Sequence, residues 1–482
     1  MRWGFTLQII GLILCFVGLS MLLPLGVAVY YHEATVAAFS KSISLITSLG
    51  VLLFVVFRRH TVEAMTHREG MAVVTLGWIG SGLFGALPFF ISGQVPHFTD
   101  CVFETFSGFT TTGASILPDI EALPKSLLFW RSLTHWLGGM GIILLSLAIL
   151  PFLGVGGMQL YKAEVPGPTP DKLRPRIKDT ALLLWKVYLI FSVLEVLLLI
   201  FGGMDLYHAL CHTFGTMATG GFSPKAASIG HYESLYFDLV ITVFMFIAGT
   251  NFALHFKLLQ GRPGAFWKDT EFKAYSLVVL GVTAAVTFTI WGEVYAGFWQ
   301  SVRYSLFQVV SIVTTTGYVT ADYESWGPLP QVLLFLCMFL GGSAGSTGGG
   351  IKCMRIIILV KHVWRELLCL VHPHAVVPVK FGGKIVSEDV LRGIWGFLFL
   401  YLFLAAASAV VLAALGVDVL TSFAAVIACI SNIGPGLAQV GPMDSYAHLP
   451  ALGKWVLSFC MLLGRLEIYT VIILLFSEFW RK

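Results

Sequence analysis

The chain has 482 residues, of which 57% are hydrophobic and only 12% are charged, and its formal net charge is +4. Soluble globular domains carry about 25% charged residues, so the composition excludes a soluble protein and predicts an integral membrane protein of many spans. The eight cysteines are scattered singly, without a Cys-x-x-Cys pair, so neither a zinc site nor a disulfide framework is expected.

Apolar runs long enough to cross about 30 Å of hydrocarbon recur along the whole chain. The first begins at Phe5 and lacks a small-residue cleavage site, so it reads as a span rather than a removed signal. A further run near 330–365 is interrupted by glycines. The continuous runs lie near residues 5–30, 36–57, 71–92, 127–152, 181–202, 235–257, 274–297, 393–415 and 453–477.

Shorter semi-apolar pieces lie between some of these runs. They occupy residues 99–110, 205–217, 301–315 and 419–431. Each is too short to span a membrane and too apolar for an ordinary loop, so we expect four re-entrant helices.

Basic tracts follow every second predicted span and set the expected topology. Cationic loops stay in the cytoplasm, so both termini are expected on that side. The tracts are Arg58 and Arg59 with Arg68, residues 172–178, 257–273, 352–365 and 380–392, and Arg481 with Lys482.

Acidic residues gather on the opposite side: Glu33, Asp100, Glu104, Asp119, Glu121, Asp205, Glu233, Glu293, Asp322, Glu324, Asp418 and Asp444. We interpret the set as an acidic vestibule that concentrates cations, although any single acid could sit in an ordinary solvated loop.

Each short piece ends in a similar turn of small residues. Residues 108–115 read GFTTTGAS, residues 215–222 read GTMATGGF, residues 314–318 read TTTGY and residues 431–436 read SNIGPG. The glycines that we take as equivalent are Gly113, Gly220, Gly317 and Gly434. They lie about 100 residues apart, and repetition at this scale indicates internal pseudo-symmetry.

Glycine reaches positive φ without a steric penalty, and irregular backbone at membrane depth is tolerated where it lines a watery path. We therefore interpret the four turns as a selectivity filter, in which backbone carbonyls replace the water shell of an ion. The negative C-terminal ends of the short helices would favour a cation there. Four ordinary surface turns are the alternative, and that alternative does not explain why the turns are alike.

A glycine-rich segment interrupts the third repeat. Residues 341–350 read GGSAGSTGGG and follow a largely apolar stretch of twelve residues, 329–340. Twelve helical residues rise about 18 Å, so we expect a mobile loop near the midplane, just inside the filter. Small-residue helix packing is the alternative.

Arg465 lies in the middle of the last apolar run, where an arginine costs about 2.5–3.5 kcal/mol to insert. We expect it to face the pore and to bind the carbonyls and hydroxyls of the glycine loop, so that loop and arginine together close the pore. The alternative is a structural arginine, paired with carbonyls of another helix or with Glu195.

Two sequence motifs point to a different class of protein. Residues 341–345 match the Gly-x-Ser-x-Gly nucleophile elbow, and residues 345–350 with Lys352 approach a phosphate-binding loop. Both motifs need a preceding strand, and a membrane helix is expected here. An intramembrane serine protease that uses Ser343 with His135, His212 or His255 is the rival hypothesis, and it leaves the four turns unexplained. We expect no enzyme.

The four turns, the interrupted span and Arg465 together resemble the Trk/Ktr/HKT superfamily of potassium transporters, and within it the TrkH/TrkG-like bacterial uptake subunits, over essentially the whole chain. The resemblance implies an all-α membrane protein with four pseudo-symmetric helix–pore helix–helix repeats around a central pore, preceded by a pair of transmembrane helices. The corresponding domains are residues 1–70, 71–160, 161–265, 266–385 and 386–482.

The resemblance also implies K⁺ as the transported ion, no bound cofactor and a location in the bacterial inner membrane. It implies a homodimer in contact with membrane lipid, a cytoplasmic nucleotide-binding regulatory subunit of the TrkA-like kind, and no nucleic acid. Channel-like flow is favoured because no carboxylate lies convincingly in the pore, whereas the family's naming favours symport coupled to protons or sodium.

The resemblance assigns potassium coordination to the four turns and gating to the glycine loop. The potassium-binding residues are Thr111, Thr112, Gly113, Thr219, Gly220, Thr316, Gly317, Ile433 and Gly434, and their neighbours are Thr110, Ala218, Thr315 and Asn432. The gate residues are Gly345, Ser346, Thr347, Gly348, Gly349, Gly350 and Arg465. The second and fourth turns depart from Thr-Thr-Gly at Ala218, Asn432 and Ile433, which leaves the number of strong sites and the rejection of Na⁺ open.

Overall fold

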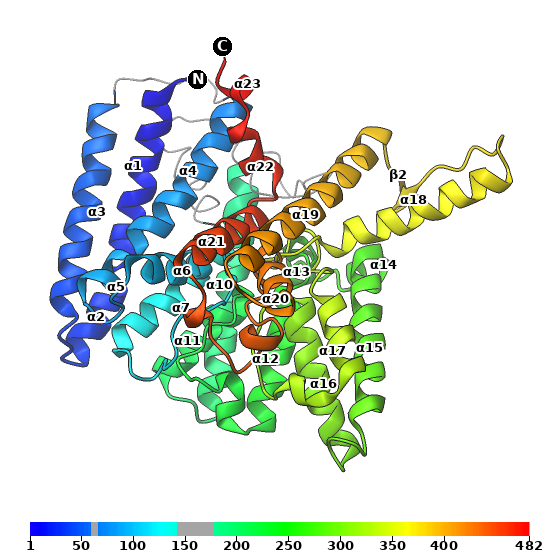
Figure 1. The fold of residues 1–482 in the computed structure, drawn as a ribbon, viewed down its shortest axis with the longest axis horizontal. Coiled ribbons are helices and arrows are strands. Elements are labelled where there is room, and N and C mark those ends of the chain that lie inside the picture. The colour runs from blue at the N-terminus through cyan, green and yellow to red at the C-terminus, as the bar shows by residue number, and fades with distance from the viewer. Residues whose placement is uncertain (59–65, 142–176, 482) are drawn as a thin grey trace.

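The computed structural model describes residues 1–58, 66–141 and 177–481. Nearly all of its regular structure is helical, because a helix satisfies its own backbone hydrogen bonds within hydrocarbon. Both termini lie at the same end of the molecule (Figure 1). Arg59, residues 142–152 of the predicted span 127–152, residues 172–176 of one basic tract and Lys482 lie outside the described residues.

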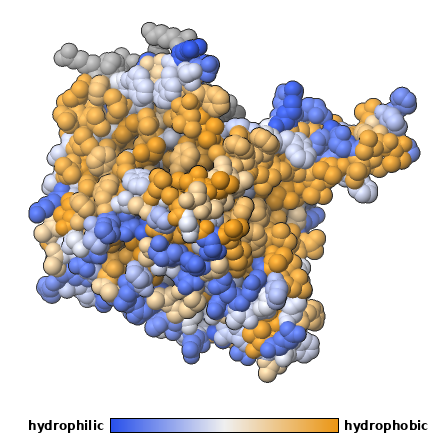
Figure 2. Space-filling model, viewed as in Figure 1, coloured by the Kyte–Doolittle hydropathy of each residue, from blue (hydrophilic) through white to orange (hydrophobic). Residues whose placement is uncertain are grey.

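Six helical stretches in the described chain are long and apolar enough to cross a membrane: Trp3–Tyr30, Val36–Val56, Arg68–Ile91, Ala181–Phe201, Thr270–Ile290 and Glu388–Ala414. They confirm the spans that hydropathy predicts at these places. The helices within them are α1 (Trp3–Ser20), α2 (Leu22–Tyr30), α3 (Val36–Val56), α4 (His67–Gly85), α5 (Leu87–Ile91), α10 (Ile177–Phe201), α15 (Thr270–Ile290) and α19 (Glu388–Ala414). Figure 2 shows a broad apolar surface on this face, with hydrophilic residues gathered along its lower edge.

The four predicted re-entrant pieces form short helices: α6 (Phe98–Phe109), α11 (Leu206–Met217), α16 (Phe298–Val313) and α20 (Val419–Ile430). Aspartate side chains cap the N-termini of two of these helices. The Asp205 carboxylate accepts a hydrogen bond from the His208 amide at 3.2 Å, and the Asp418 carboxylate accepts one from the Thr421 amide at 3.0 Å. These aspartates, which the sequence placed among the acids of a vestibule, are helix N-caps.

A second helix follows each short helix and ends partway across the expected membrane thickness. These second helices are α7 (Lys125–Gly139), α12 (Leu235–Ala248), α17 (Pro328–Cys337) and α21 (Ala451–Arg465). We predicted such a break only in the third repeat. The runs predicted as continuous at 235–257 and 453–477 are therefore each divided into two helices by a sharp bend.

Local backbone chemistry explains both breaks. The chain turns by 103° between α12 and α13 (Phe252–Leu259), where the Asn251 side chain caps the new helix by accepting from the Ala253 amide at 2.8 Å. It turns by 114° after α21, where Glu467 and Ile468 have φ of 58° and 39°. Averaged hydropathy does not reveal these bends, because the few polar residues at them, Thr250 and Asn251 or Arg465 and Glu467, are flanked by long apolar stretches.

The remaining elements are short or lie outside the continuous runs predicted as spans. They are α14 (Gly264–Lys268), α18 (Cys353–Val371), β1 (Lys380–Phe381), β2 (Lys384–Ile385), α22 (Tyr469–Ile472) and α23 (Ser477–Trp480). Short 3-10 helices lie at Ser228–Tyr232, Tyr323–Trp326, Ala438–Val440, Tyr446–His448 and Ile473–Leu475. Strands β1 and β2 pair antiparallel, and they project with α18 from the body of the molecule (Figure 1).

Candidate ion site at the four glycine turns

The chain adopts the same unusual backbone conformation after each of the four short helices. In each turn a non-glycine residue has a positive φ, and so does a glycine two positions later. The non-glycine residues are Thr111 at 54°, Thr219 at 54°, Thr315 at 61° and Asn432 at 56°. The glycines are Gly113 at 83°, Gly221 at 79°, Gly317 at 79° and Gly434 at 94°. Left-handed backbone costs a non-glycine residue about 1–2 kcal/mol, so the surrounding structure must hold all four turns in this shape.

The hydrogen bonds of the turns correct the sequence alignment in the second repeat. In each turn one amide reaches back five residues into the short helix. The donors are Thr112, Gly220, Thr316 and Ile433, and the acceptors are the carbonyls of Ser107, Gly215, Ser311 and Ala428, at 2.8–2.9 Å. Gly220 is thus equivalent to Thr112 rather than to Gly113, and Gly221 is the equivalent glycine. The sequence alignment placed Gly220 at the position that Gly221 occupies, because the two glycines are adjacent.

The four turns close into a ring through their glycines. A Cβ on Gly113 would collide with the carbonyl oxygen of Gly220, one on Gly221 with that of Thr316, and one on Gly317 with that of Ile433. A Cβ on Gly434 would lie 2.7 Å from the Thr112 oxygen. Each glycine therefore lies against a carbonyl of the next turn, and the fourth turn meets the first. This close approach is the physical reason for glycine at these positions.

The same four carbonyl oxygens accept no hydrogen bond from any residue that the structure describes. They belong to Thr112, Gly220, Thr316 and Ile433. Buried backbone carbonyls are almost always paired, so a ring of four unpaired ones is unusual. Rings of free backbone carbonyls are what a dehydrated potassium ion binds.

Hydroxyl groups behind the ring bind one another. The Thr110 hydroxyl donates to the Phe106 carbonyl at 2.6 Å and lies 2.7 Å from the Thr112 hydroxyl. Thr314 repeats both contacts in the third turn, with the Val310 carbonyl and the Thr316 hydroxyl, each at 2.7 Å.

The fourth turn uses its departure from Thr-Thr-Gly for a different bond. The Asn432 amide nitrogen donates to the Thr112 hydroxyl at 2.9 Å and to the Met461 carbonyl at 2.9 Å. The asparagine thereby joins the fourth turn to the first.

A cavity of about 260 Å³ opens onto all four glycines, Gly113, Gly221, Gly317 and Gly434. Asp444 and Lys225 also line it. Two of the acids that we predicted around this cavity form ion pairs within the protein. Asp100 forms an ion pair with Lys454 at 2.6 Å, and Glu104 is buried in an ion pair with Arg131. These two acids are structural, which corrects their assignment to a solvated vestibule.

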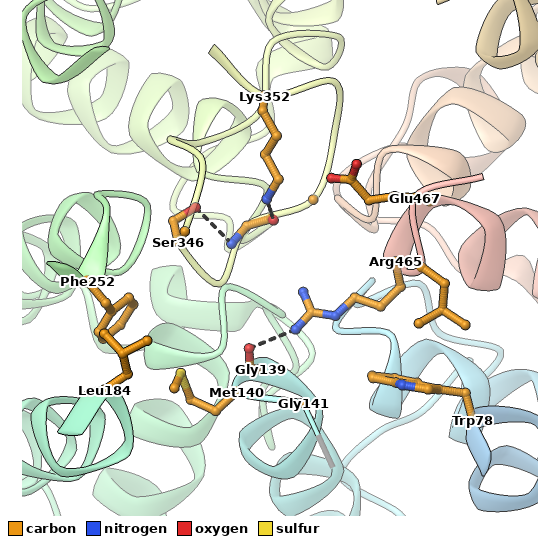
Figure 3. A pocket seen from close by; sticks show the side chains of 15 residues that line it. Trp78, Gly139, Met140, Gly141, Leu184, Phe252, Ser346, Lys352, Arg465 and Glu467 are labelled. Atoms are coloured by element: carbon orange, nitrogen blue, oxygen red, sulfur yellow. Dashed lines mark hydrogen bonds between the residues drawn. The ribbon is translucent and has the colours of Figure 1, made fainter. Parts of the chain in front are cut away.

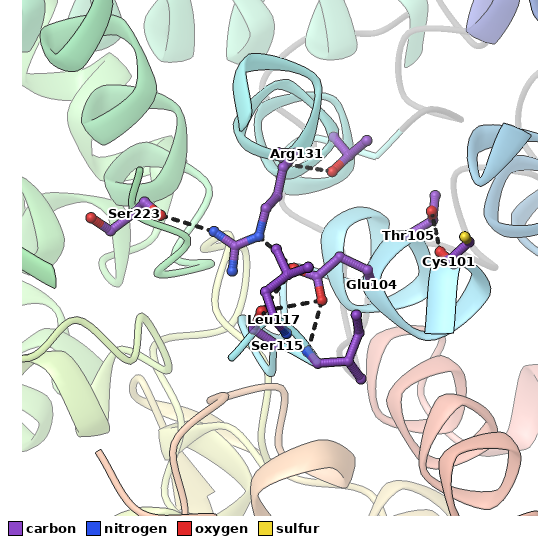
Figure 4. Close-up of polar contacts among 9 residues, drawn as sticks. Cys101, Glu104, Thr105, Ser115, Leu117, Arg131 and Ser223 are labelled. Carbon is purple, nitrogen blue, oxygen red and sulfur yellow. Dashed lines mark hydrogen bonds and ion pairs between the residues drawn. The ribbon is translucent and has the colours of Figure 1, made fainter. Parts of the chain in front are cut away.

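The Glu104–Arg131 pair ties the first two turns together (Figure 4). The Glu104 carboxylate also accepts from the Ser115 hydroxyl at 3.0 Å and from the Ile116 amide at 2.9 Å. Arg131 donates to the Ser223 carbonyl at 2.9 Å, and its guanidinium lies 3.5 Å from the ring centre of Phe222. Sequence reasoning missed Arg131, although a lone arginine inside an apolar run is the same signal that singled out Arg465.

The glycine loop lies directly against the other side of the turns. The Thr347 hydroxyl donates to the Met217 carbonyl at 3.0 Å, at the end of α11. The Gly349 amide donates to the Thr315 hydroxyl at 2.7 Å. The loop therefore lies next to the turns, as predicted.

Arg465 joins this loop to the first repeat. Its guanidinium donates to the Thr347 carbonyl at 2.6 Å and to the Gly138 carbonyl at 2.6 Å. It also donates to the Gly139 carbonyl at 2.7 Å (Figure 3). The predicted contact between arginine and loop carbonyls is confirmed. The contact with carbonyls of another helix is present as well, because Gly138 and Gly139 end α7. A cavity of about 100 Å³ lies beside the guanidinium.

Two further charged residues hold the loop, and sequence reasoning missed both. The Glu271 carboxylate accepts from the Ala344 amide at 2.8 Å and from the Met354 amide at 2.9 Å, so it clasps both sides of the loop. The Lys352 ammonium donates to the Gly348 carbonyl. Both residues lie in tracts that we interpreted as cytoplasmic charge. Lys352 directly follows the loop in sequence, whereas only the fold brings Glu271 to it.

The arrangement does not support a serine protease. The Ser343 hydroxyl makes no hydrogen bond with any described residue. His212 contacts the Tyr232 hydroxyl at 3.1 Å, His255 contacts the Ile247 carbonyl at 2.8 Å, and His135 packs on Phe222. None of the three activates the serine.

Comparison with known proteins identifies the family. Residues 35–481 match the family model described as TrkH, cation transport protein. The chain is 42% identical to the Trk system potassium uptake protein TrkH of Escherichia coli K12, over 98% of this chain and 99% of that protein. It is 36% identical to TrkG of the same organism, over 98% and 97% of the two chains.

A solved structure agrees with these relatives. The crystal structure of the potassium transporter TrkH from Vibrio parahaemolyticus superposes with a TM-score of 0.90 at 37% identity, covering 100% of both chains. The chain is thus a multi-pass membrane protein that belongs to the TrkH family of cation transport proteins.

Proposed function

We propose that this chain takes up potassium across the bacterial inner membrane through the ring of turns. The observation that carries the proposal is the set of four unpaired carbonyl oxygens, on Thr112, Gly220, Thr316 and Ile433, each held against a glycine of the neighbouring turn. Relatives that are named potassium uptake proteins match over nearly the full chain. The potassium sites comprise these carbonyls together with Thr111, Gly113, Thr219, Gly221, Gly317 and Gly434.

The glycine loop and Arg465 form the gate in this proposal. The loop packs against turns two and three through Thr347 and Gly349, and Arg465 carries a positive charge to the same place. A guanidinium cannot lose its charge in a protein, so it repels a cation until it moves. Glycines give the loop the conformational freedom to move with it.

The wider assignments extend the proposal. Both termini face the cytoplasm, the chain works as a homodimer in lipid, and a cytoplasmic nucleotide-binding subunit acts on the gate. Flow is channel-like. Symport is the second candidate, because Glu467, which is ion-paired with Arg355, lines the cavity beside Arg465 and places a carboxylate near the path.

The test is rubidium flux into proteoliposomes that hold the purified chain, under a clamped potential and with and without a pH gradient. Uptake that K⁺ blocks far better than Na⁺ supports the proposal, and independence from the pH gradient supports channel-like flow. Arg465→Ala is measured in parallel, because a wild-type chain whose gate stays closed would show no flux even if its pore conducts potassium. Absence of rubidium flux in both proteins would refute potassium transport.

A further inference from the structure

One of the four ring positions lacks a side chain of its own. Thr112, Thr316 and Ile433 each carry a side chain behind the carbonyl that they contribute, whereas Gly220 has none. A glycine is the most flexible residue of the backbone, so the second turn has the least intrinsic means of holding its carbonyl in place.

The imidazole of His135 fills that space. A Cβ built on Gly220 would overlap the Nδ1 and Cγ atoms of the His135 ring and would lie 2.7 Å from its Cε1. His135 comes from α7 of the first repeat, so the second turn is supported by a neighbouring repeat. The ring occupies the volume where the other turns place their own side chain.

His135 itself is held firmly on its other sides. It is completely buried, and its ring centre lies 4.0 Å from that of Phe222, the residue that Arg131 also contacts. Neither ring nitrogen meets hydrogen-bond geometry with any described residue, and its polar neighbour is the Gly108 backbone. The contact that bears on the second turn is therefore the ring's volume against Gly220.

We propose that His135 is a positioning residue for the second turn, which sets the preference for K⁺ over Na⁺ by holding the Gly220 carbonyl in the ring. The inference depends on the proposed potassium function. A ring of carbonyls discriminates between ions through the spacing and number of its oxygens, and functional groups need support to keep such spacing. Gly220 and His135 act as one steric unit, divided between two repeats.

The test removes the His135 side chain and then adds a side chain at Gly220 to replace the lost volume. His135→Ala removes the support, and His135→Ala with Gly220→Thr returns a side chain of the type that turns one and three carry. His255→Ala is the matched control, because His255 is also buried but bonds the Ile247 carbonyl. For each variant we measure the K⁺/Na⁺ flux ratio in proteoliposomes and the amount of protein inserted in the membrane.

We expect His135→Ala to lower the flux ratio severalfold at normal insertion, the double variant to recover most of it, and His255→Ala to keep it. An unchanged ratio in His135→Ala overturns the inference, and so does a lowered ratio that the double variant fails to recover. If His135→Ala does not insert, the double variant decides, since it must both insert and discriminate. A wild-type chain that does not prefer K⁺ would refute the proposed function instead.

Discussion

The glycines of the ring offer a sharp test, because the structure separates their two roles. Gly317 has a φ of 79°, and a Cβ there would collide with the Ile433 carbonyl oxygen and lie 2.8 Å from the Pro435 ring. Gly317→Ser therefore carries two penalties. The left-handed backbone costs about 1–2 kcal/mol, and the collision forces the Ile433 carbonyl out of the ring by on the order of 1 Å in a closely packed interior.

Gly416 provides the matched control. Its φ is 91°, but a Cβ there would meet nothing within 4 Å. Gly416→Ser pays the backbone penalty without touching a carbonyl, so both variants should lose similar stability from the backbone and only Gly317→Ser should lose selectivity. Each 1.4 kcal/mol of lost discrimination lowers the K⁺/Na⁺ ratio about tenfold.

The assay is the K⁺/Na⁺ flux ratio per inserted molecule in proteoliposomes, with thermal unfolding in detergent as the measure of stability. We expect a ratio at least tenfold lower for Gly317→Ser and an unchanged ratio for Gly416→Ser. Equal ratios in the two variants, with both proteins inserted, would show that the carbonyl ring does not select the ion.

Two further predictions concern the gate, and a third concerns the N-cap of a short helix. Arg465→Ala should raise K⁺ flux per inserted molecule, because the charge beside the path and its bonds to the loop are lost; normal flux at normal insertion would contradict the gate. Glu271→Gln should also raise flux and weaken dependence on a regulator, since a neutral amide binds the Ala344 and Met354 amides less strongly; an unchanged open fraction would count against this clasp. Asp418→Ala should lower the free energy of unfolding by about 1 kcal/mol. Hydrogen bonds from Thr421 lower the pKa of Asp418 below its ordinary value, so this stability is present above that ordinary value. It should be lost as the pH falls through about 4 and below, and a difference that persists unchanged in acid would contradict the assignment.

The sequence predicted the turns well because their signal is local. Four Thr-Gly-like turns after short apolar pieces are visible without a structure, and so is Arg465. The register of the second turn was not predictable, since Gly220 and Gly221 are chemically identical in sequence and only backbone hydrogen bonds distinguish them. The bends after α12 and α21 were missed because the few polar residues at them are outweighed by the apolar residues on both sides.

Contacts between distant segments account for the other omissions. Glu271 lies in a basic tract, and nothing in its neighbours indicates that it holds a loop more than seventy residues away. His135 was considered only as a protease residue, because its proximity to Gly220 arises where the first and second repeats pack. Side-chain identity indicated that these residues were unusual, but the fold determined what they support.

The central claim is that a cation binds among the four unpaired carbonyls. It is tested most directly by anomalous X-ray scattering from crystals of the purified chain grown in rubidium. The account predicts an anomalous peak inside the ring, surrounded by the carbonyl oxygens of Thr112, Gly220, Thr316 and Ile433, that disappears when Na⁺ replaces Rb⁺. Ordered density for all four turns with no peak among those oxygens would contradict it.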